Sequence, residues 1–397
     1  MRPVFTYLFF FYAAVALSQQ PDMALLKTRA LMDQKNYNAA LENLRPIVKK
    51  NLLAYMWLGD CNYAKRDFSN AILFYLKADS MNKDIASFEL SRCFAQKHDN
   101  QNAILWLQKH LALTHKKTEL EITTDTAFTD LSETNAWKNL WKKSWYTDME
   151  ISRNAIAALI EKGNATEATD ELEKLKDRFT PKHEYFALSA KAYSKQNMLE
   201  PAILFINEAI VLYSRSDEYF SLRAELLFKT GKYANALEDM TKAIRLNPNV
   251  PSYYLKRAEI ARLAGNNGIA ETDLKTYREL YPESAETYHQ LGLLENAKGH
   301  YLNALDYYDK LIEKEQGKAQ YFIERGNNAL AANQIGKADE DFGMALDLNP
   351  NLPEAYLQKG NARIILQDTQ AACFNWKKAK QLGSIEAAKV IYQNCKE

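Results

Sequence analysis

Apolar side chains recur at intervals of three and four residues along most of the chain, in runs of about 12 to 14 residues separated by short polar turns. This spacing places the apolar residues of each run on one face of an α-helix. Glycines follow the first helix of several pairs and prolines follow the second, where helices end: Gly231, Gly265, Gly299, Pro248, Pro282 and Pro350. The pattern therefore predicts an all-α chain built of helical hairpins.

The predicted hairpins repeat every 34 residues, because an alanine recurs at that interval at Ala168, Ala202, Ala236, Ala270, Ala304, Ala338 and Ala372. We number the repeat so that this alanine occupies slot 20. Slot 4 is then aromatic, at Phe186, Phe220, Tyr254, Tyr288, Phe322 and Tyr356. Slot 8 is small, at Ala190, Ala224, Ala258, Gly292, Gly326 and Gly360. Slot 24 is large, at Leu172, Ile206, Met240, Leu274, Tyr308, Phe342 and Trp376. We expect small residues at slots 8 and 20 to let the two helices of a hairpin approach closely, with slots 4 and 24 filling the flanking space.

These residues resemble the tetratricopeptide-repeat (TPR) family. The resemblance is carried by Tyr288-x-x-Leu291-Gly292, Tyr301, Ala304, Tyr308, and by the segment from Gly231-Lys232-Tyr233 to Asn247-Pro248. It covers most of the chain after the first eighteen residues. It implies a TPR α-solenoid, a right-handed superhelix of helical hairpins, that acts by binding other proteins.

The register of the repeat divides the chain into five parts. Earlier alanines at slot 20, Ala40, Ala71 and Ala103, are spaced by 31 and 32 residues, and the 65 residues from Ala103 to Ala168 fall short of two periods. We therefore expect a signal peptide at 1–18, an N-terminal array of about three repeats at 19–118, an irregular helical insertion at 119–147, a C-terminal array of about seven repeats at 148–383, and a capping helix with a tail at 384–397.

The insertion carries three tryptophans four residues apart, Trp137, Trp141 and Trp145. On a helix these side chains would share one face. One interpretation is that this stripe packs over the exposed end of one array. The other is an exposed aromatic patch that binds a partner, with Lys138, Lys142 and Lys143 beside it.

Residues 1–18 have the composition of a secretory signal peptide, with one charge at Arg2, an apolar run from Val4 to Leu17, and the small residues Ala16 and Ser18 at positions −3 and −1 before the expected cleavage. The run is shorter than the roughly 20 residues needed to cross a bilayer. We therefore expect an exported protein, periplasmic or secreted. The alternative is a membrane anchor made by an uncleaved N-terminal segment.

The charge balance argues against nucleic acid as a partner. The chain has 51 basic and 50 acidic residues, interleaved along its length, whereas phosphate backbones are bound by concentrated basic surfaces. We expect protein or peptide partners, no nucleic acid, and contact with a membrane only through an envelope complex or an uncleaved anchor.

Four cysteines are expected to meet an oxidising compartment after export. Gly383 is the predicted turn between two antiparallel helices, and Cys373 and Cys395 lie at similar distances on either side of it. We predict a disulfide between them that holds the capping helix. Cys61 and Cys93 occupy equivalent places on consecutive repeats, too far apart for a bond, and are expected to be buried free thiols.

No catalytic or cofactor motif is apparent. The six histidines show no metal-ligand spacing, and there is no glycine-rich phosphate loop and no nucleophile elbow. We therefore predict no metal, no cofactor and no enzymatic activity.

The TPR resemblance implies that slots 2, 5, 9, 12 and 13 of each first helix face a concave groove. In the last four repeats these slots include Leu255, Arg262, Leu263, His289, Leu293, Asn296, Ile323, Asn327, Leu330, Leu357, Asn361, Ile364 and Ile365. We hypothesise that they bind an extended or helical peptide segment. The alternative is that slots 12 and 13 are partly buried between neighbouring repeats. Slot 5 carries no lysine, so the carboxylate clamp used by part of the family is not expected.

The sequence thus predicts a non-enzymatic scaffold of the cell envelope that binds partner polypeptides in its groove. Two alternatives stay open: a periplasmic chaperone-like holder or adaptor for exported clients, and the regulatory arm of a larger enzyme or sensor assembly.

Overall fold

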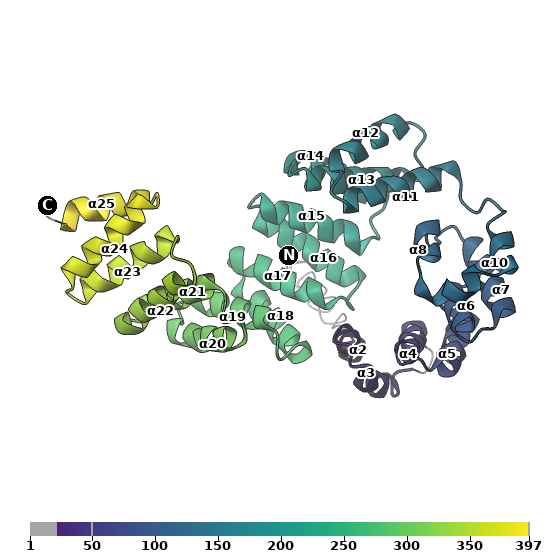
Figure 1. Cartoon of the computed structure of the whole chain (residues 1–397), viewed down its shortest axis with the longest axis horizontal. Coiled ribbons are helices and arrows are strands. Elements are labelled where there is room, and N and C mark those ends of the chain that lie inside the picture. Colours follow the sequence, from purple (N-terminus) through teal and green to yellow (C-terminus); the bar gives the residue numbers. More distant parts are fainter. Residues whose placement is uncertain (1–21, 49–50, 396–397) are drawn as a thin grey trace, which may run out of the picture. The chain divides into compact units, whose positions relative to one another are not determined.

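The computed structural model describes residues 22–48 and 51–395. Within these residues the chain forms 24 α-helices and one short 3₁₀-helix, and no β-strand (Figure 1). The fold is all-α and consists of packed helical hairpins, as the periodicity predicted. The expected signal peptide, residues 1–18, lies outside the described residues. The chain divides into two compact units, residues 1–253 and 254–397, and each is described by itself below.

Unit 1 contains six hairpins and a group of short helices. The hairpins are α2 (Met23–Asp33) with α3 (Tyr37–Leu44), α4 (Leu52–Ala64) with α5 (Phe68–Met81), α6 (Ser87–Gln96) with α7 (Asn100–Leu111), α11 (Asp148–Glu161) with α12 (Ala165–Leu175), α13 (Lys182–Lys195) with α14 (Leu199–Leu212), and α15 (Asp217–Lys229) with α16 (Tyr233–Leu246). The short helices are α8 (Glu119–Thr123), η2 (Thr126–Phe128), α9 (Thr129–Ser132) and α10 (Asn135–Leu140).

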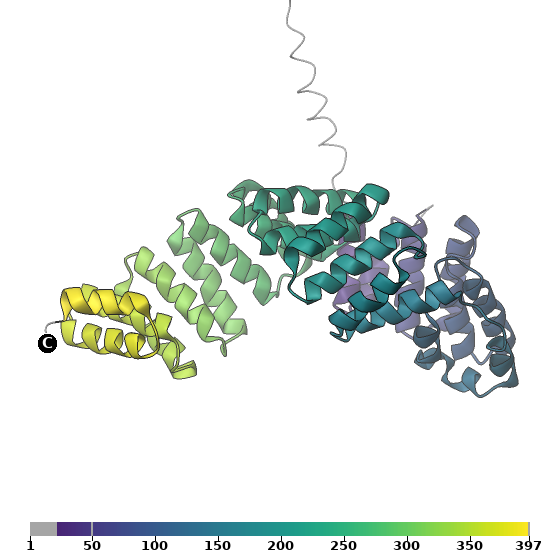
Figure 2. The same cartoon turned by 90° about the horizontal axis from the view of Figure 1, so that it is seen from above.

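Unit 2 is a regular stack of hairpins, drawn from green to yellow in Figure 2. Its helices are α17 (Pro251–Leu263), which begins just before the unit boundary, α18 (Asn267–Leu280), α19 (Ala285–Ala297), α20 (Tyr301–Lys314), α21 (Ala319–Ala331), α22 (Ile335–Leu348), α23 (Pro353–Ile365), α24 (Thr369–Gln381) and α25 (Ile385–Asn394). The domain boundaries expected from the register, at 118 and 147, stay predictions.

The close approach of the two helices in a hairpin depends on the pairing of slot 8 with slot 24. A methyl group added at Gly360 would lie 2.4 Å from the Trp376 ring, and one added at Gly326 would lie 2.7 Å from the Phe342 ring. Gly59 lies under Tyr75 and Gly292 under Tyr308 in the same way. Where slot 8 is alanine instead, slot 24 is aliphatic, as in Ala190 with Ile206, Ala224 with Met240, and Ala258 with Leu274. In these hairpins the smallest residue at slot 8 therefore accompanies the largest side chains at slot 24, which keeps the combined volume of the pair similar.

A buried ion pair, which the sequence analysis did not predict, also joins the helices of three hairpins. The arginine at slot 7 contacts the aspartate at slot 23, with nitrogen–oxygen distances of 2.6 to 2.7 Å, in the pairs Arg223–Asp239, Arg257–Asp273 and Arg325–Asp341. The aspartate side chains are at most 5% exposed. Loss of one of these arginines would leave a buried carboxylate without its partner, which is strongly destabilising.

The turn between the two helices of a hairpin uses a left-handed residue at slot 15. Gly299 has φ +78° there. The same slot holds residues with a Cβ in other hairpins, including His98 at φ +57° and Gln367 at φ +65°. Glycine was expected at the end of the first helix of a hairpin. The same left-handed turn also forms in hairpins that have another residue at slot 15.

The tryptophans of the insertion do not share one helix, which corrects the expectation for this stripe. Helix α10 ends at Leu140, so Trp141 is its C-terminal cap and Trp145 lies in the irregular segment before α11. The indole nitrogen of Trp145 donates to the Leu140 carbonyl at 2.8 Å. Trp137 is 7% exposed and packs with Phe128 in a core that also contains residues of α6 and α7. Trp137 is therefore a buried core residue, and Trp141 and Trp145 lie half-buried against the same core.

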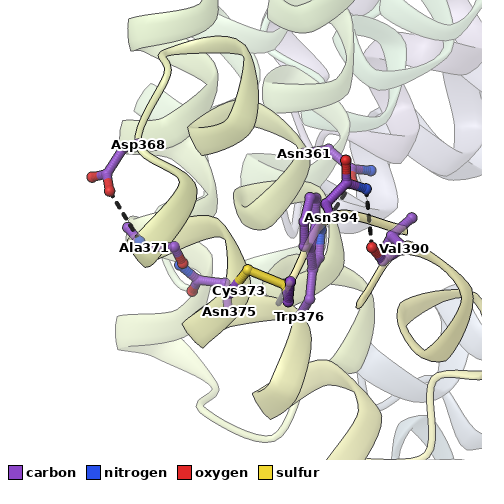
Figure 3. The surroundings of a disulfide bond; sticks show 9 residues. Asn361, Asp368, Ala371, Cys373, Asn375, Trp376, Val390 and Asn394 are labelled. Atoms are coloured by element: carbon purple, nitrogen blue, oxygen red, sulfur yellow. Dashed lines mark hydrogen bonds between the residues drawn. A yellow bond between two sulfur atoms is a disulfide. The ribbon is translucent and has the colours of Figure 1, made fainter. Parts of the chain in front are cut away.

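The C-terminal helix α25 packs on α24 as the predicted cap. The sulfur atoms of Cys373 and Cys395 are bonded, and the Cα atoms are 5.8 Å apart. Ala387 of α25 is fully buried against the Trp376 cluster. Figure 3 shows the Trp376 ring beside the disulfide, with Asn361 on its other side. Cys61 and Cys93 are free and buried, and burial raises the pKa of each thiol to about 12.

Candidate partner-binding face

The candidate site is one face of the four first helices of unit 2, α17, α19, α21 and α23. We call it the unit 2 face and define it by slots 2, 5, 9, 12 and 13. Exposure is graded across it in a way that repeats from helix to helix. Slots 2 and 13 are exposed in all four helices, at Ser252, Glu286, Gln320, Glu354, Leu263, Ala297, Ala331 and Ile365.

Slots 9 and 12 are half-buried in all four helices. Slot 9 holds Glu259, Leu293, Asn327 and Asn361, and slot 12 holds Arg262, Asn296, Leu330 and Ile364. These two rows lie one turn apart on each helix, so they form a continuous strip across the stack. The strip combines three apolar side chains and three amides with the charged Glu259 and Arg262 on its first helix. Apolar side chains and amides suit a surface that holds a peptide by packing and by hydrogen bonds to its backbone.

Slot 5 belongs largely to the interior. Ile323 is 1% exposed and Leu357 is 7% exposed, so neither can contact a partner in this conformation. Leu255 and His289 are half-buried. Of the predicted face residues, therefore, Ile323 and Leu357 support the packing of the stack, while the others reach its surface.

Two polar contacts tie α19 directly to α21. His289 Nε2 lies 2.7 Å from Glu324 Oε2, and Asn296 Nδ2 donates to Asn328 Oδ1 at 2.8 Å. Burial alone would lower the pKa of His289, but the hydrogen bond and the charge of Glu324 outweigh it and raise this pKa. Both contacts fix the spacing of neighbouring first helices, so the strip between them is preorganised.

The two asparagine side chains at slot 9, Asn327 and Asn361, differ in the number of hydrogen bonds that they form. Asn361 Oδ1 accepts from the indole nitrogen of Trp376 at 3.0 Å (Figure 3). Asn361 Nδ2 donates to Gln358 Oε1. The side chain of Asn327, on the same row, forms no hydrogen bond with any described residue. Its amide can donate and accept at once, which suits a peptide backbone.

Sequence reasoning missed the two partners that hold the strip in place, Glu324 and Asn328. His289 at slot 5 contacts Glu324 at slot 6 of the next repeat, and Asn296 at slot 12 contacts Asn328 at slot 10 of the next repeat. A search for complementary residues 32 or 35 positions apart would have found both contacts. The described residues contain no cluster of three or more histidine, cysteine, aspartate or glutamate side chains able to hold a metal ion. No helix among them is both long and apolar enough to cross a bilayer.

Two family models match the chain, and both are described as tetratricopeptide repeat. One covers residues 25–84 and the other residues 217–250, which are the α2–α5 region and the α15–α16 hairpin. The chain is a tetratricopeptide-repeat protein. No curated protein matches this TPR chain in sequence.

Three solved structures are similar to this TPR chain. A tetratricopeptide-repeat protein from Parabacteroides merdae is 18% identical, with a TM-score of 0.51 over 62% of this chain and 96% of its own. The C-terminal part of a TPR repeat-containing protein from Cytophaga hutchinsonii is 16% identical over 62% and 100%, with a TM-score of 0.48. The Cut9–Hcn1 hetero-tetramer of the APC/C contains a chain that is 13% identical over 96% and 98%, with a TM-score of 0.47.

Membership of the TPR family fixes the general class of function. TPR proteins are generally non-enzymatic scaffolds that bind other proteins. This chain is accordingly a protein–protein interaction scaffold. The unit 2 face is the candidate for its partner-binding surface.

Proposed function

We propose that this TPR chain is an exported scaffold of the cell envelope that holds a partner polypeptide along the unit 2 face. The observation that supports the binding site is the strip of slots 9 and 12, half-buried in four successive helices. Apolar side chains that are neither fully buried nor fully exposed gain further burial when a peptide covers them. Exposed slots 2 and 13 border the strip and form a polar and aliphatic rim.

Export is supported by the sequence of residues 1–18, which has the charged start, the apolar run and the small residues of a signal peptide. The disulfide between Cys373 and Cys395 agrees with an oxidising compartment, because such bonds persist outside the reducing cytosol. A fusion of residues 1–30 to a reporter active only after export tests this part, since a reporter that stays inactive would contradict it.

Site-specific photo-crosslinking in the native cell tests the binding site. A photoreactive residue at Asn327 should form a crosslink to a partner. The same residue at Gln381, an exposed amide on the second helix α24, serves as the matched control and should form none. Equal crosslinking at both positions would contradict the proposed face.

The composition of the crosslinked material separates the scaffold from the holder. One partner at a fixed ratio to the chain supports a scaffold. Many different exported proteins, each present at a low ratio, would favour the chaperone-like holder instead.

A further inference from the structure

A second candidate site lies in unit 1, where the register of the repeat is broken. A cavity of about 430 Å³ opens between α6, α7, the segment after α7, α11 and α13. Its volume falls in the roughly 300 to 1,000 Å³ range of ligand pockets. Phe88, Ile85 and Leu113 form the apolar part of its wall. The cavity shares no residue with the unit 2 face.

All the lysine and arginine side chains that line the cavity are already paired with carboxylates. Lys116 Nζ lies 2.7 Å from Glu150, and both side chains are at most 16% exposed. Lys117 Nζ lies 2.9 Å from Glu121. Arg153 Nη1 lies 2.7 Å from Glu184, the third acidic residue of the lining. These pairs neutralise the positive charges of the wall.

His110 adds no charge to the cavity at neutral pH. Its Nε2 accepts a hydrogen bond from the backbone N–H of Lys117 at 2.9 Å, which requires an unprotonated nitrogen. Burial, reinforced by the nearby lysine charges of residues 117 and 116, lowers the pKa of His110 to about 4. The imidazole therefore stays neutral, and its ring lies tilted against the Phe88 ring, with 5.0 Å between the ring centroids.

Two carboxylates of the lining, Asp84 and Glu89, form no ion pair among the described residues. Glu89 lies half-buried on α6, next to the apolar wall. Burial raises the pKa of Glu89, and the Asp60 carboxylate adds to this effect, while Arg92 and Lys117 oppose it. After the pairs described above are formed, the uncompensated charge of the cavity is negative.

We propose that this cavity binds one lysine or arginine side chain of a partner polypeptide, with the cationic group at Glu89 and the methylene stem against Phe88 and Ile85. A desolvated carboxylate gains most from a cation that also brings hydrogen-bond donors. The long aliphatic stem of lysine or arginine covers apolar surface while its head stays at the polar end. The cavity therefore selects a basic residue in whichever polypeptide the scaffold holds.

The test uses trifluoroacetyl-capped pentapeptides with a central lysine, arginine or glutamine between alanines, titrated with the full chain and followed by ¹⁹F NMR. The lysine or arginine peptide should bind at least tenfold more tightly than the glutamine peptide. E89Q should reduce its affinity to that of the glutamine peptide, and D84N should reduce it less. Cadaverine, a free diamine, should bind more weakly than the lysine peptide.

The matched control is E133Q in the same unit, which removes one exposed carboxylate that forms no ion pair with any described residue, and it should leave the affinities unchanged. Circular dichroism should show the same helical signal for all variants. Equal binding of lysine and glutamine peptides, or an E89Q chain that keeps the preference, would overturn the proposal. Cadaverine binding as tightly as the peptide would overturn the assignment to a polypeptide. Variants at Asn327 report on the unit 2 face alone, so the two proposals fail independently.

Discussion

Hairpins α19–α24 and the region α6–α10 show how differently one chain builds its core with and without a fixed register. In α19–α24 the 34-residue frame places a glycine of the first helix under an aromatic ring of the second in each hairpin. In α6–α10 the frame is lost after Ala103, and short helices add Phe128, Leu131 and Trp137 to the core formed with α6 and α7.

The difference extends from packing to surface chemistry. A repeating frame repeats its surface as well, so half-buried side chains form the long rows of slots 9 and 12. A broken frame brings together side chains that no repeat pairs, and it leaves a cavity with two carboxylates that form no ion pair within the part of the chain that the structure describes. The regular array is suited to a long ligand, and the irregular region to a single side chain. The four predictions below test this comparison.

The largest effect is expected from W376A, because Trp376 is 2% exposed and lies on Gly360. The loss of a buried aromatic ring costs about 3 to 5 kcal/mol. In a repeat array each hairpin contacts only its neighbours, so hydrogen exchange should accelerate in α21–α25 and not in α6–α10. W137A should have the converse pattern. F374A, at a 60% exposed position on the same helix as Trp376, is the control and should change little.

Removal of the disulfide by C373S with C395S should cost about 3 kcal/mol, because the bond closes a loop in the unfolded chain. Its two cysteines are 22 residues apart. The effect should be confined to the cap, with faster exchange in α24 and α25. An unchanged exchange rate in α25 would show that packing on Ala387 alone holds this helix.

The pairing of slot 8 with slot 24 predicts that G360A destabilises unit 2 by about 1 to 3 kcal/mol, because its methyl group would overlap the Trp376 ring. G336A is the control, since a methyl group there meets no atom within 4 Å. Alanine at that helical position should stabilise by up to about 1 kcal/mol. Urea unfolding of the two variants should therefore shift in opposite directions.

The smallest effect is expected at the turns. Q367G should stabilise its hairpin by about 1 kcal/mol, because Gln367 has a φ of +65° that favours glycine. H98G should do the same in the irregular region, where His98 occupies the same slot at φ +57°. Thermal unfolding measures both. If Q367G raises the stability and H98G does not, the benefit of glycine at this turn would be limited to the hairpins that keep the 34-residue repeat.

The fold was predictable from the sequence because the repeated alanines, the repeated aromatic residues and the turn residues each predict the same helical hairpin. The pairing of Cys373 with Cys395 followed from the single turn at Gly383 between them. The burial of Ile323 and Leu357 was not predictable, because slot 5 is half-exposed in one repeat and buried in the next. For the region α8–α10 the sequence predicted only that the 34-residue register is lost. Its packing was not predictable, because it depends on contacts between short helices that follow no period.

The most direct test of the proposed face uses the partner identified by crosslinking and measures its affinity for N327K and Q381K by calorimetry. Both variants replace a half-buried or exposed amide with lysine, on a first helix and on a second helix respectively. We predict at least a tenfold loss of affinity for N327K, about 1.4 kcal/mol, and no change for Q381K. Equal affinities for the two variants would contradict binding along the unit 2 face.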